Sequence, residues 1–210
     1  PDYVEKDYKF LKQLLVFDVV PGGYGGGPNE PPEKSRTSYR KLMPVFRILH
    51  NLMWQPITLA SSSHSSAVVE RYGNAPGPVV FVVSNIGEDD IVSFAIDKSA
   101  VPGGTATWCY DPLGDNQLNW KWESGKLKVS TALKSDQTAV IVVGAQDAQK
   151  KFKQLWAKDR LDDVQLCFKE YKLRNKTEHP LAAKAQKLNG AADMRSLAKA
   201  ANPDSPVTKR

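Results

Sequence analysis

The sequence predicts an α+β protein in which helices come first, an antiparallel β-sandwich follows, and a basic helical tail comes last. Three observations predict this order. Apolar residues recur at spacings of three and four before residue 60 and again after residue 147, as in amphipathic helices. Between residues 67 and 144, short apolar runs alternate with turn residues, which is typical of a sandwich. The balance of charge also changes near Gly144.

Composition and charge limit the class of protein. The 210 residues are 41% hydrophobic and 25% charged, which excludes wholesale disorder, collagen and a coiled-coil rod. No apolar run approaches the roughly 20 residues of a membrane helix. The net charge of +6 is uneven, because residues 145–210 carry 15 Lys+Arg and 8 Asp+Glu, whereas residues 1–144 carry 14 and 15. We therefore predict three segments, residues 1–60, 61–144 and 145–210.

The first segment is predicted to hold a helix, a strand, a loop and a second helix. Residues 2–17 carry an amphipathic stripe, and the apolar run 14–20 then favours a strand. Five Gly and two Pro within residues 21–28 indicate a loop. An apolar stripe over residues 35–52 predicts the second helix, with Pro44 expected near its first turn, where proline is tolerated.

The second segment is predicted to be the sandwich. Trp54–Ala60 is expected to be a short extended piece, and the serine-rich residues 61–66 a polar connection. Seven strand candidates follow, each bounded by turn residues: Val68–Tyr72, Val79–Ser84, Ile91–Ile96, Thr105–Tyr110, Gln117–Trp122, Leu127–Thr131 and Ala139–Val143.

The third segment is predicted to form three helices. The first begins near Phe152 and the second near Leu161, with the pair Asp162-Asp163 close to its N-terminus, where negative charge suits the helix dipole. An alanine-rich stretch over residues 181–201 predicts the third. Eight acidic residues are interspersed among the basic ones. The segment is therefore expected to form solvated helices that pack an apolar stripe against the β-domain, rather than a basic arm for an acidic polymer such as nucleic acid, an anionic polysaccharide or a membrane surface.

Three motifs carry a resemblance to a known family. They are YRKLMPVFRILHNLMWQPITLA at residues 39–60, AVVERYG at 67–73 and VVFVVSN at 79–85. This pattern resembles the C-terminal part of glycoside-hydrolase-like proteins built on a (β/α)8 barrel, with their helix of the type YKKYMPL, the motif GWEPVT, and strands such as VERFG and LYFTVxN. The resemblance covers about residues 5–144. Met53 departs from it by replacing a small residue, and the glycine-rich loop and the basic tail have no counterpart in the pattern.

The resemblance implies that residues 1–60 are the end of a barrel, with 14–20 a late barrel strand, and that 61–144 form the β-domain that braces the barrel. Active sites of such barrels lie at the C-terminal ends of the strands. The loop after Val20 would therefore border a substrate cleft, and an oligosaccharide or polysaccharide is the implied partner. The acid and base of glycoside hydrolysis would lie on earlier strands. Since the chain begins with Pro1 and no targeting segment, we expect further sequence before it.

Four residues are candidates for substrate binding. Asp18 interrupts an apolar run, and it could bind a sugar hydroxyl or be a paired structural carboxylate. Tyr24 stands among five glycines, where it could stack on a sugar or pack within the loop. Trp120 and Trp122 share one face of a strand. Exposed, they would form a sugar platform; buried, they would belong to the core, as tryptophan usually does.

Other chemistry is not indicated, and no cofactor is expected. The glycine-rich loop is not followed by the Lys-Ser/Thr of a phosphate loop. His64 in the serine-rich connection, with Asp90 downstream, lacks the surroundings of a catalytic serine. No Cys/His pair has the spacing of metal ligands, and Cys109 and Cys167 are expected to be thiols. The alternative to the enzyme portion is a non-catalytic carbohydrate- or polyanion-binding or scaffold module.

Overall fold

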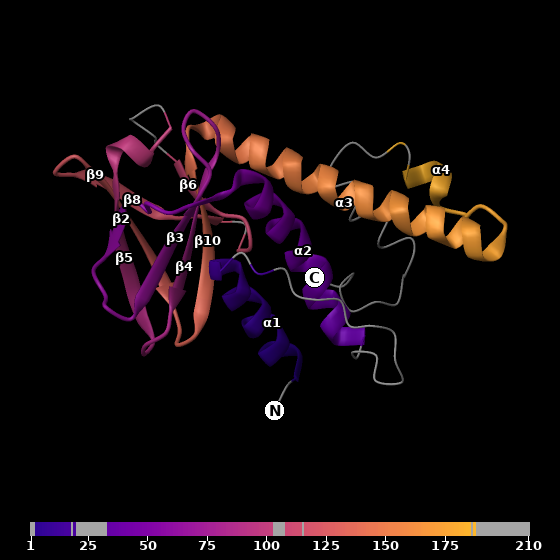
Figure 1. The fold of residues 1–210 in the computed structure, drawn as a ribbon, viewed down its shortest axis with the longest axis horizontal. Coiled ribbons are helices and arrows are strands. Elements are labelled where there is room, and N and C mark those ends of the chain that lie inside the picture. The colour runs from indigo at the N-terminus through magenta and orange to yellow at the C-terminus, as the bar shows by residue number, and fades with distance from the viewer. Residues whose placement is uncertain are drawn as a thin grey trace. The chain divides into compact units, whose positions relative to one another are not determined.

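The chain forms two compact units, residues 1–152 and 153–210, and each is considered by itself. The computed structural model (Figure 1) describes residues 3–17, 19, 33–102, 108–114, 116–185 and 187. No helix in these ranges is both long enough and apolar enough to cross a membrane. The predicted boundaries after residues 60 and 144 stay predictions.

The chain begins with α1 (Tyr3–Leu14), and a 3-10 turn, η1 (Leu15–Phe17), follows without a break. The expected strand from residue 14 is therefore wrong over residues 14–17, and Val19 is not in a strand either. Leu11, Leu15 and Val16 explain the difference, because all three are buried at helical spacing. A short apolar run does not by itself separate a strand from a buried helical turn.

The second helix, α2 (Glu33–Leu52), begins two residues before its predicted start and contains Pro44 in its interior. The expectation that Pro44 lies near the first turn is wrong. Proline has no backbone N–H, so the bond to the carbonyl four residues earlier is missing. The apolar side chains around it, Val45, Phe46 and Leu49, are completely buried, and this packing stabilises the helix despite the missing bond.

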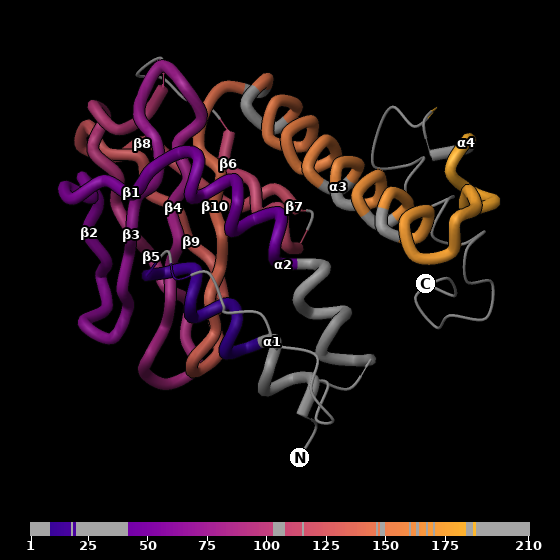
Figure 2. Tube along the Cα trace, turned by 45° about the vertical axis from the view of Figure 1, so that its right-hand side comes forward, coloured from indigo at the N-terminus to yellow at the C-terminus, as the bar shows by residue number. Residues whose placement is uncertain are grey.

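Ten strands in the described ranges form two antiparallel sheets, which confirms the predicted α+β class and its antiparallel sandwich. One sheet has the order β1-β3-β4-β10-β6-β7 and the other has the order β2-β5-β9-β8. The strands are β1 (Trp54–Gln55), β2 (Ala60–Ser62), β3 (Ala67–Tyr72), β4 (Val79–Asn85), β5 (Asp90–Asp97), β6 (Trp108–Asp111), β7 (Asn116–Gln117), β8 (Asn119–Glu123), β9 (Lys126–Leu133) and β10 (Gln137–Gly144). Figure 2 shows β1 beside β3 at the edge of the larger sheet.

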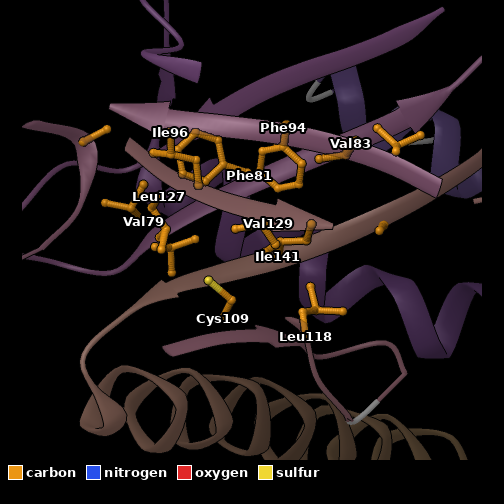
Figure 3. Packing of buried hydrophobic residues seen from close by; sticks show 14 of the residues in the cluster. Val79, Phe81, Val83, Phe94, Ile96, Cys109, Leu118, Leu127, Val129 and Ile141 are labelled. Atoms are coloured by element: carbon orange, nitrogen blue, oxygen red, sulfur yellow. The ribbon is translucent and has the colours of Figure 1, made fainter. Parts of the chain in front are cut away.

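The core lies between the two sheets (Figure 3). Alternate residues of β4 and β10 meet alternate residues of β5 and β9 there, as expected for facing sheets. The rings of Phe81 and Phe94, one from each sheet, are tilted by 46° with centroids 6.2 Å apart. Cys109 is a buried thiol in the same cluster.

The larger sheet also buries its other face. The helical segment packs on it, with α1 against β10 and η1 against β3 and β4. The Tyr72 hydroxyl lies within hydrogen-bond distance of the backbone oxygens of Leu15 (3.0 Å) and Val16 (3.1 Å), to which it donates. The Lys9 ammonium pairs with the carboxylate of Asp136 at 3.0 Å, in the turn before β10. The first unit therefore has three layers, in the order helices, six-stranded sheet, four-stranded sheet.

The tail contains one long helix, α3 (Gln146–Asn175), in place of the first two predicted helices. No Gly or Pro interrupts the sequence between them, so nothing ends the first. Asp162 lies in the middle of α3, and the expected dipole interaction at an N-terminus is wrong. Of the third predicted helix, α4 (Ala182–Ala185) is described, and all later residues except 187 lie outside the described ranges.

The end of α3 is capped by the turn that follows it. Lys176 has a φ of 55°, the left-handed conformation that commonly ends a helix, and its N–H donates to the Lys172 carbonyl at 2.8 Å. The His179 ring then packs on Phe168 and Tyr171, with centroids 4.7 and 4.8 Å away. The second unit thus has a small aromatic cluster of its own.

Candidate functional site

Two of the four predicted substrate-binding residues, Asp18 and Tyr24, lie outside the described residues. Their proposed roles stay predictions. The loop that would carry Tyr24 begins a few residues after Phe17, which is strongly exposed. The last described residue before that loop is Val19, whose N–H donates to the Leu14 carbonyl at 3.3 Å.

The other two, Trp120 and Trp122, are brought together on β8. Both are half-buried and pack against the core between the sheets, opposite Val129 and Leu127 of β9. Lys121 between them is exposed, as alternation along a strand requires. This arrangement favours core packing over an open sugar platform. A sugar contact through the remaining exposed parts of the two indoles stays a prediction.

A different tryptophan is more exposed. Trp54 lies on β1, the outermost strand of the larger sheet, and 49% of it is accessible to solvent. Its indole Nε1 donates to the Glu70 carboxylate at 2.8 Å. Trp54 pairs with Tyr72 across the two strands, so Glu70 is its diagonal neighbour on the same face of the sheet. The carboxylate therefore holds an exposed aromatic ring in one orientation.

Backbone geometry fixes the position of β1. Met53 has a φ of 67° and ends α2, with its N–H donating to the carbonyls of Leu49 and His50. The Met53 carbonyl accepts from Gly73 N–H at 3.0 Å. Gly73 has a φ of 80°, and a Cβ there would lie 2.3 Å from the Pro78 carbonyl oxygen, so only glycine fits.

Two amide side chains lie next to Trp54 at this edge. Asn74 Nδ2 donates to Gln55 Oε1 at 2.9 Å, and Gln55 Nε2 donates to the Met53 carbonyl at 3.2 Å. Met53 and Ile57, two residues before and two residues after Gln55, are also exposed, at 64% and 66%. We call Met53, Trp54, Gln55, Glu70 and Asn74 the Trp54 edge.

Arg71 lies beside the Trp54 edge, on the opposite face of β3. It pairs with Gln55 across the strands and is only 7% exposed. Its Nε has no hydrogen-bond partner, and burial of the guanidinium lowers its pKa. Burial disfavours the charged form of a basic side chain.

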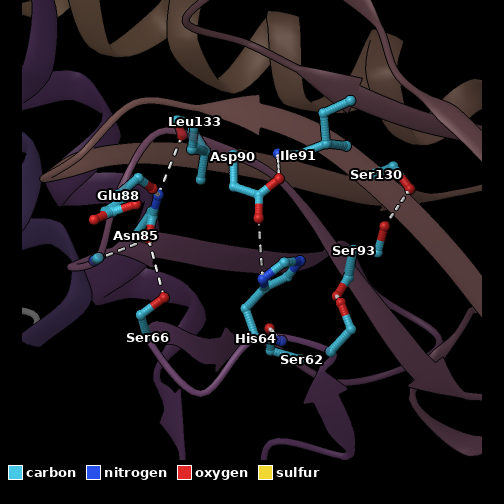
Figure 4. A network of polar contacts seen from close by, with 12 residues as sticks. Ser62, His64, Ser66, Asn85, Glu88, Asp90, Ile91, Ser93, Ser130 and Leu133 are labelled. Atoms are coloured by element: carbon cyan, nitrogen blue, oxygen red, sulfur yellow. Dashed lines mark hydrogen bonds and ion pairs between the residues drawn. The ribbon is translucent and has the colours of Figure 1, made fainter.

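A second polar cluster connects β2, β4 and β5 (Figure 4). Asn85 is at its centre: its amide nitrogen donates to the carbonyls of Glu88 (2.6 Å) and Leu133 (3.2 Å), and its oxygen accepts from Gly87 N–H at 3.0 Å. Ser66 adds a weaker contact to the same oxygen at 3.4 Å. These bonds satisfy a buried amide and hold the turn between β4 and β5, so the cluster is structural.

The imidazole in this cluster does not form a catalytic triad. His64 Nδ1 is 3.4 Å from the Asp90 carboxylate, and both side chains are partly exposed. The nearby Ser62 hydroxyl accepts a hydrogen bond from the His64 backbone N–H. The hydroxyl groups of Ser93 and Ser130 are hydrogen-bonded to each other at 2.8 Å. In the described residues, no group of three His, Cys, Asp or Glu side chains is placed to hold a metal ion.

The outer face of the four-stranded sheet carries ion pairs. Glu123 accepts from Lys128 at 2.6 Å and lies 3.6 Å from Lys121. The hydrogen bond from Lys128 and the positive charges of both lysines lower the pKa of Glu123. Lys126 pairs with Asp97 at 3.1 Å. Exposed pairs of this kind stabilise a fold little.

The fold and these surfaces define a class, an antiparallel β-sandwich with helices on the outer face of its larger sheet. No family model and no curated protein matches the chain. Among solved structures it is similar to a GH27 β-L-arabinopyranosidase from Geobacillus stearothermophilus, with a TM-score of 0.46 and 16% identity, over 67% of this chain and 31% of that one. A variant of that enzyme in complex with arabinose gives 0.45 and 16%, over 65% and 30%. The chain thus covers less than a third of either protein.

The Trp54 edge was not predicted from the sequence, in which Trp54 and Glu70 belong to separate motifs at residues 39–60 and 67–73. Their partnership depends on the pairing of β1 with β3 across 16 residues. One signal was available, because a tryptophan directly after a predicted helix end and before Pro56 has no helical stripe in which to be buried.

Proposed function

We propose that the chain is the C-terminal portion of a carbohydrate-active, glycoside-hydrolase-like protein, and that its β-domain braces a catalytic barrel. The observation that carries this proposal is the two-sided apolar character of the first helical segment. Leu11, Leu15 and Val16 pack on the sandwich, whereas Phe10 and Phe17 are 56% and 71% exposed. The two rings are seven residues apart, about two helical turns, and contiguous exposed apolar side chains mark contact surfaces.

In this proposal residues 1–60 supply the last barrel elements, and Phe10 and Phe17 face the rest of the barrel. Asp18 and Tyr24 would lie beside the substrate cleft, and the catalytic acid and base would come from preceding sequence. The 31% coverage of the similar enzyme leaves most of such a protein outside this chain. Its substrate would be an oligosaccharide or polysaccharide.

The test uses the reading frame that contains this chain. The sequence encoded before Pro1 is expressed separately, and its association with the 210-residue chain is measured by calorimetry. Phe17→Ser is expected to weaken association by about tenfold or more, because a buried aromatic contact is lost. Ile91→Ser, at an exposed apolar position on β5 (61% against 71% for Phe17), is the matched control. Absence of preceding barrel-like sequence, or unchanged binding by Phe17→Ser, contradicts the proposal.

The activity is tested on the complete gene product with aryl glycosides of both anomeric configurations. Hydrolysis of any of them supports the enzyme assignment, and no hydrolysis favours the second candidate. That candidate is a non-catalytic carbohydrate-binding module. The exposed Trp54, held by Glu70, is the observation that favours it.

A further inference from the structure

We propose that the Trp54 edge is a binding subsite for a neutral sugar ring, with Trp54 as the stacking surface. The inference deepens the carbohydrate-binding role proposed above and rests on it. It does not depend on the barrel contact, because the two surfaces use different residues. The experiment on sugar binding at Trp54 and the experiment on barrel association at Phe17 can therefore give opposite outcomes.

The indole ring of Trp54 is held in one orientation before a ligand binds. An exposed tryptophan normally samples several rotamers, and ordering it on binding costs free energy. Here the Nε1–H···Glu70 bond of 2.8 Å and the pairing of Trp54 with Tyr72 fix the indole before any ligand arrives. The C–H groups of a pyranose face pack well on such an apolar ring, and about half of Trp54 remains accessible for this contact.

Hydrogen-bonding capacity is left along this edge, with Glu70 on the face of the ring and the Gln55–Asn74 pair on the other face. Glu70 uses one carboxylate oxygen for Trp54, and Asn74 uses one N–H for Gln55. Within the described part of the chain, Glu70 Oε1 and Asn74 Oδ1 have no partner, and each amide nitrogen has a second N–H to give. Two acceptors and two donors are thus available, a mixture that suits hydroxyl groups, which both donate and accept.

Other classes of ligand fit this edge less well. A phosphate or sulfate would meet the Glu70 carboxylate next to the ring and would be repelled. Arg71 lies on the face of Gln55 and is only 7% exposed, so its side chain offers little surface to a ligand on either face. A purely apolar partner would leave the Glu70 carboxylate desolvated. The chemistry that satisfies both the indole and its polar neighbours is a neutral, hydroxyl-bearing ring.

The place of the site in the sheet is also suitable. β1 has only two residues and is the edge of the larger sheet, so one side of its backbone is unpaired in that sheet. A sugar chain lying along this edge can contact Trp54 on one face and Gln55 on the other. The turn with Gly73 keeps Asn74 within 2.9 Å of Gln55, so the two amides act together.

The test measures binding of xylohexaose, cellohexaose and mannohexaose to the 210-residue chain by calorimetry, with polygalacturonate as an anionic probe. At least one neutral oligosaccharide is expected to bind, and more tightly than polygalacturonate. Trp54→Ala is expected to raise the Kd by about tenfold or more, and Trp54→Phe and Glu70→Gln by smaller factors, because they keep a ring or its position.

Ile91→Ala is the matched control, since it removes an exposed apolar side chain from β5 of the other sheet. Its Kd is expected to stay within about twofold of the parent, provided circular dichroism shows a folded chain. Trp120→Ala tests the alternative platform on β8. No binding of any neutral oligosaccharide overturns the proposal, and so does a Trp54→Ala variant with unchanged Kd. Loss of binding in Trp120→Ala but not in Trp54→Ala would assign the platform to β8 instead.

Discussion

The six-stranded and four-stranded sheets share one core but differ in what covers their outer faces. Helices cover the larger sheet, so β4 is buried at every position from Val79 to Asn85. Among the described residues of the first unit no α-helix covers the smaller sheet, and β8 alternates between exposed and half-buried residues over Asn119–Glu123. The sequences of the strands differ in the same way. The sequence of β4, VVFVVSN, begins with five consecutive apolar residues, whereas polar and apolar residues alternate in that of β8, NWKWE. Hydrophobic continuity in a strand thus indicates how many of its faces are covered.

The largest effect is expected in the shared core. Phe81→Ala removes a fully buried ring between the sheets and is expected to lower the free energy of unfolding by about 3–5 kcal/mol. Ile91→Ala, on the open face of β5, is expected to change it by about 0.5 kcal/mol or less. Urea unfolding followed by circular dichroism measures both. Similar losses from the two variants would show that the open face is covered.

Stability measurements at alkaline pH can test whether the Cys109 thiol in the core is shielded from water. Burial raises the pKa of the Cys109 thiol from 9.0 to about 12. Because the unfolded chain loses this proton first, stability is complete below about pH 9 and falls as pH rises towards 12, by about 1.4 kcal/mol per pH unit. Cys109→Ala, compared in a Cys167→Ser background, is expected to lack this part of the slope. Equal slopes would mean that water reaches the thiol.

The link between the helices and the larger sheet has a smaller expected effect. Tyr72→Phe keeps the ring but leaves the Leu15 and Val16 carbonyls without the hydroxyl donor. The free energy of unfolding is expected to fall by about 1–2 kcal/mol. Ser93→Ala, which loses a hydroxyl contact on the open face, is the control, with an expected loss of about 0.5 kcal/mol. Hydrogen exchange should show faster opening of η1 in Tyr72→Phe alone.

The smallest effect is expected on the open face itself. Lys128 and Lys121 lower the pKa of Glu123, so this ion pair stabilises the fold above the ordinary pKa of glutamate and ceases to do so as pH falls through the lowered value. Glu123 is exposed to solvent, and Glu123→Gln is expected to shift the urea midpoint at pH 7 very little. An NMR titration should place the Glu123 midpoint below 4.5, and Lys128→Gln should raise it.

The sandwich was predictable from sequence because its strands have a clear period and clear turns. Predicted strands such as Val68–Tyr72 and Val79–Ser84 match β3 and β4 within a residue. The spacing of apolar residues does not distinguish a strand from a buried helical turn at residues 14–17, because all four of these residues are apolar. Tertiary packing decides there, since Leu15 and Val16 meet the larger sheet and Tyr72 bonds their carbonyls.

The candidate site was less predictable than the fold, for a physical reason. A binding surface depends on which side chains meet, and Trp54 meets Glu70 only through strand pairing. Met53 follows α2 in a left-handed conformation that favours glycine, so the backbone at this residue sets where β1 begins.

The strands at the sheet edges are short. β1 and β7 have two residues each, β2 has three, and β8 has five, with Lys121 and Glu123 on its outer face. A second chain could add a new strand only over a few residues, so neither sheet can easily extend from one molecule to the next. Among the described strands, a contact made through a sheet edge would therefore depend more on side chains than on backbone pairing.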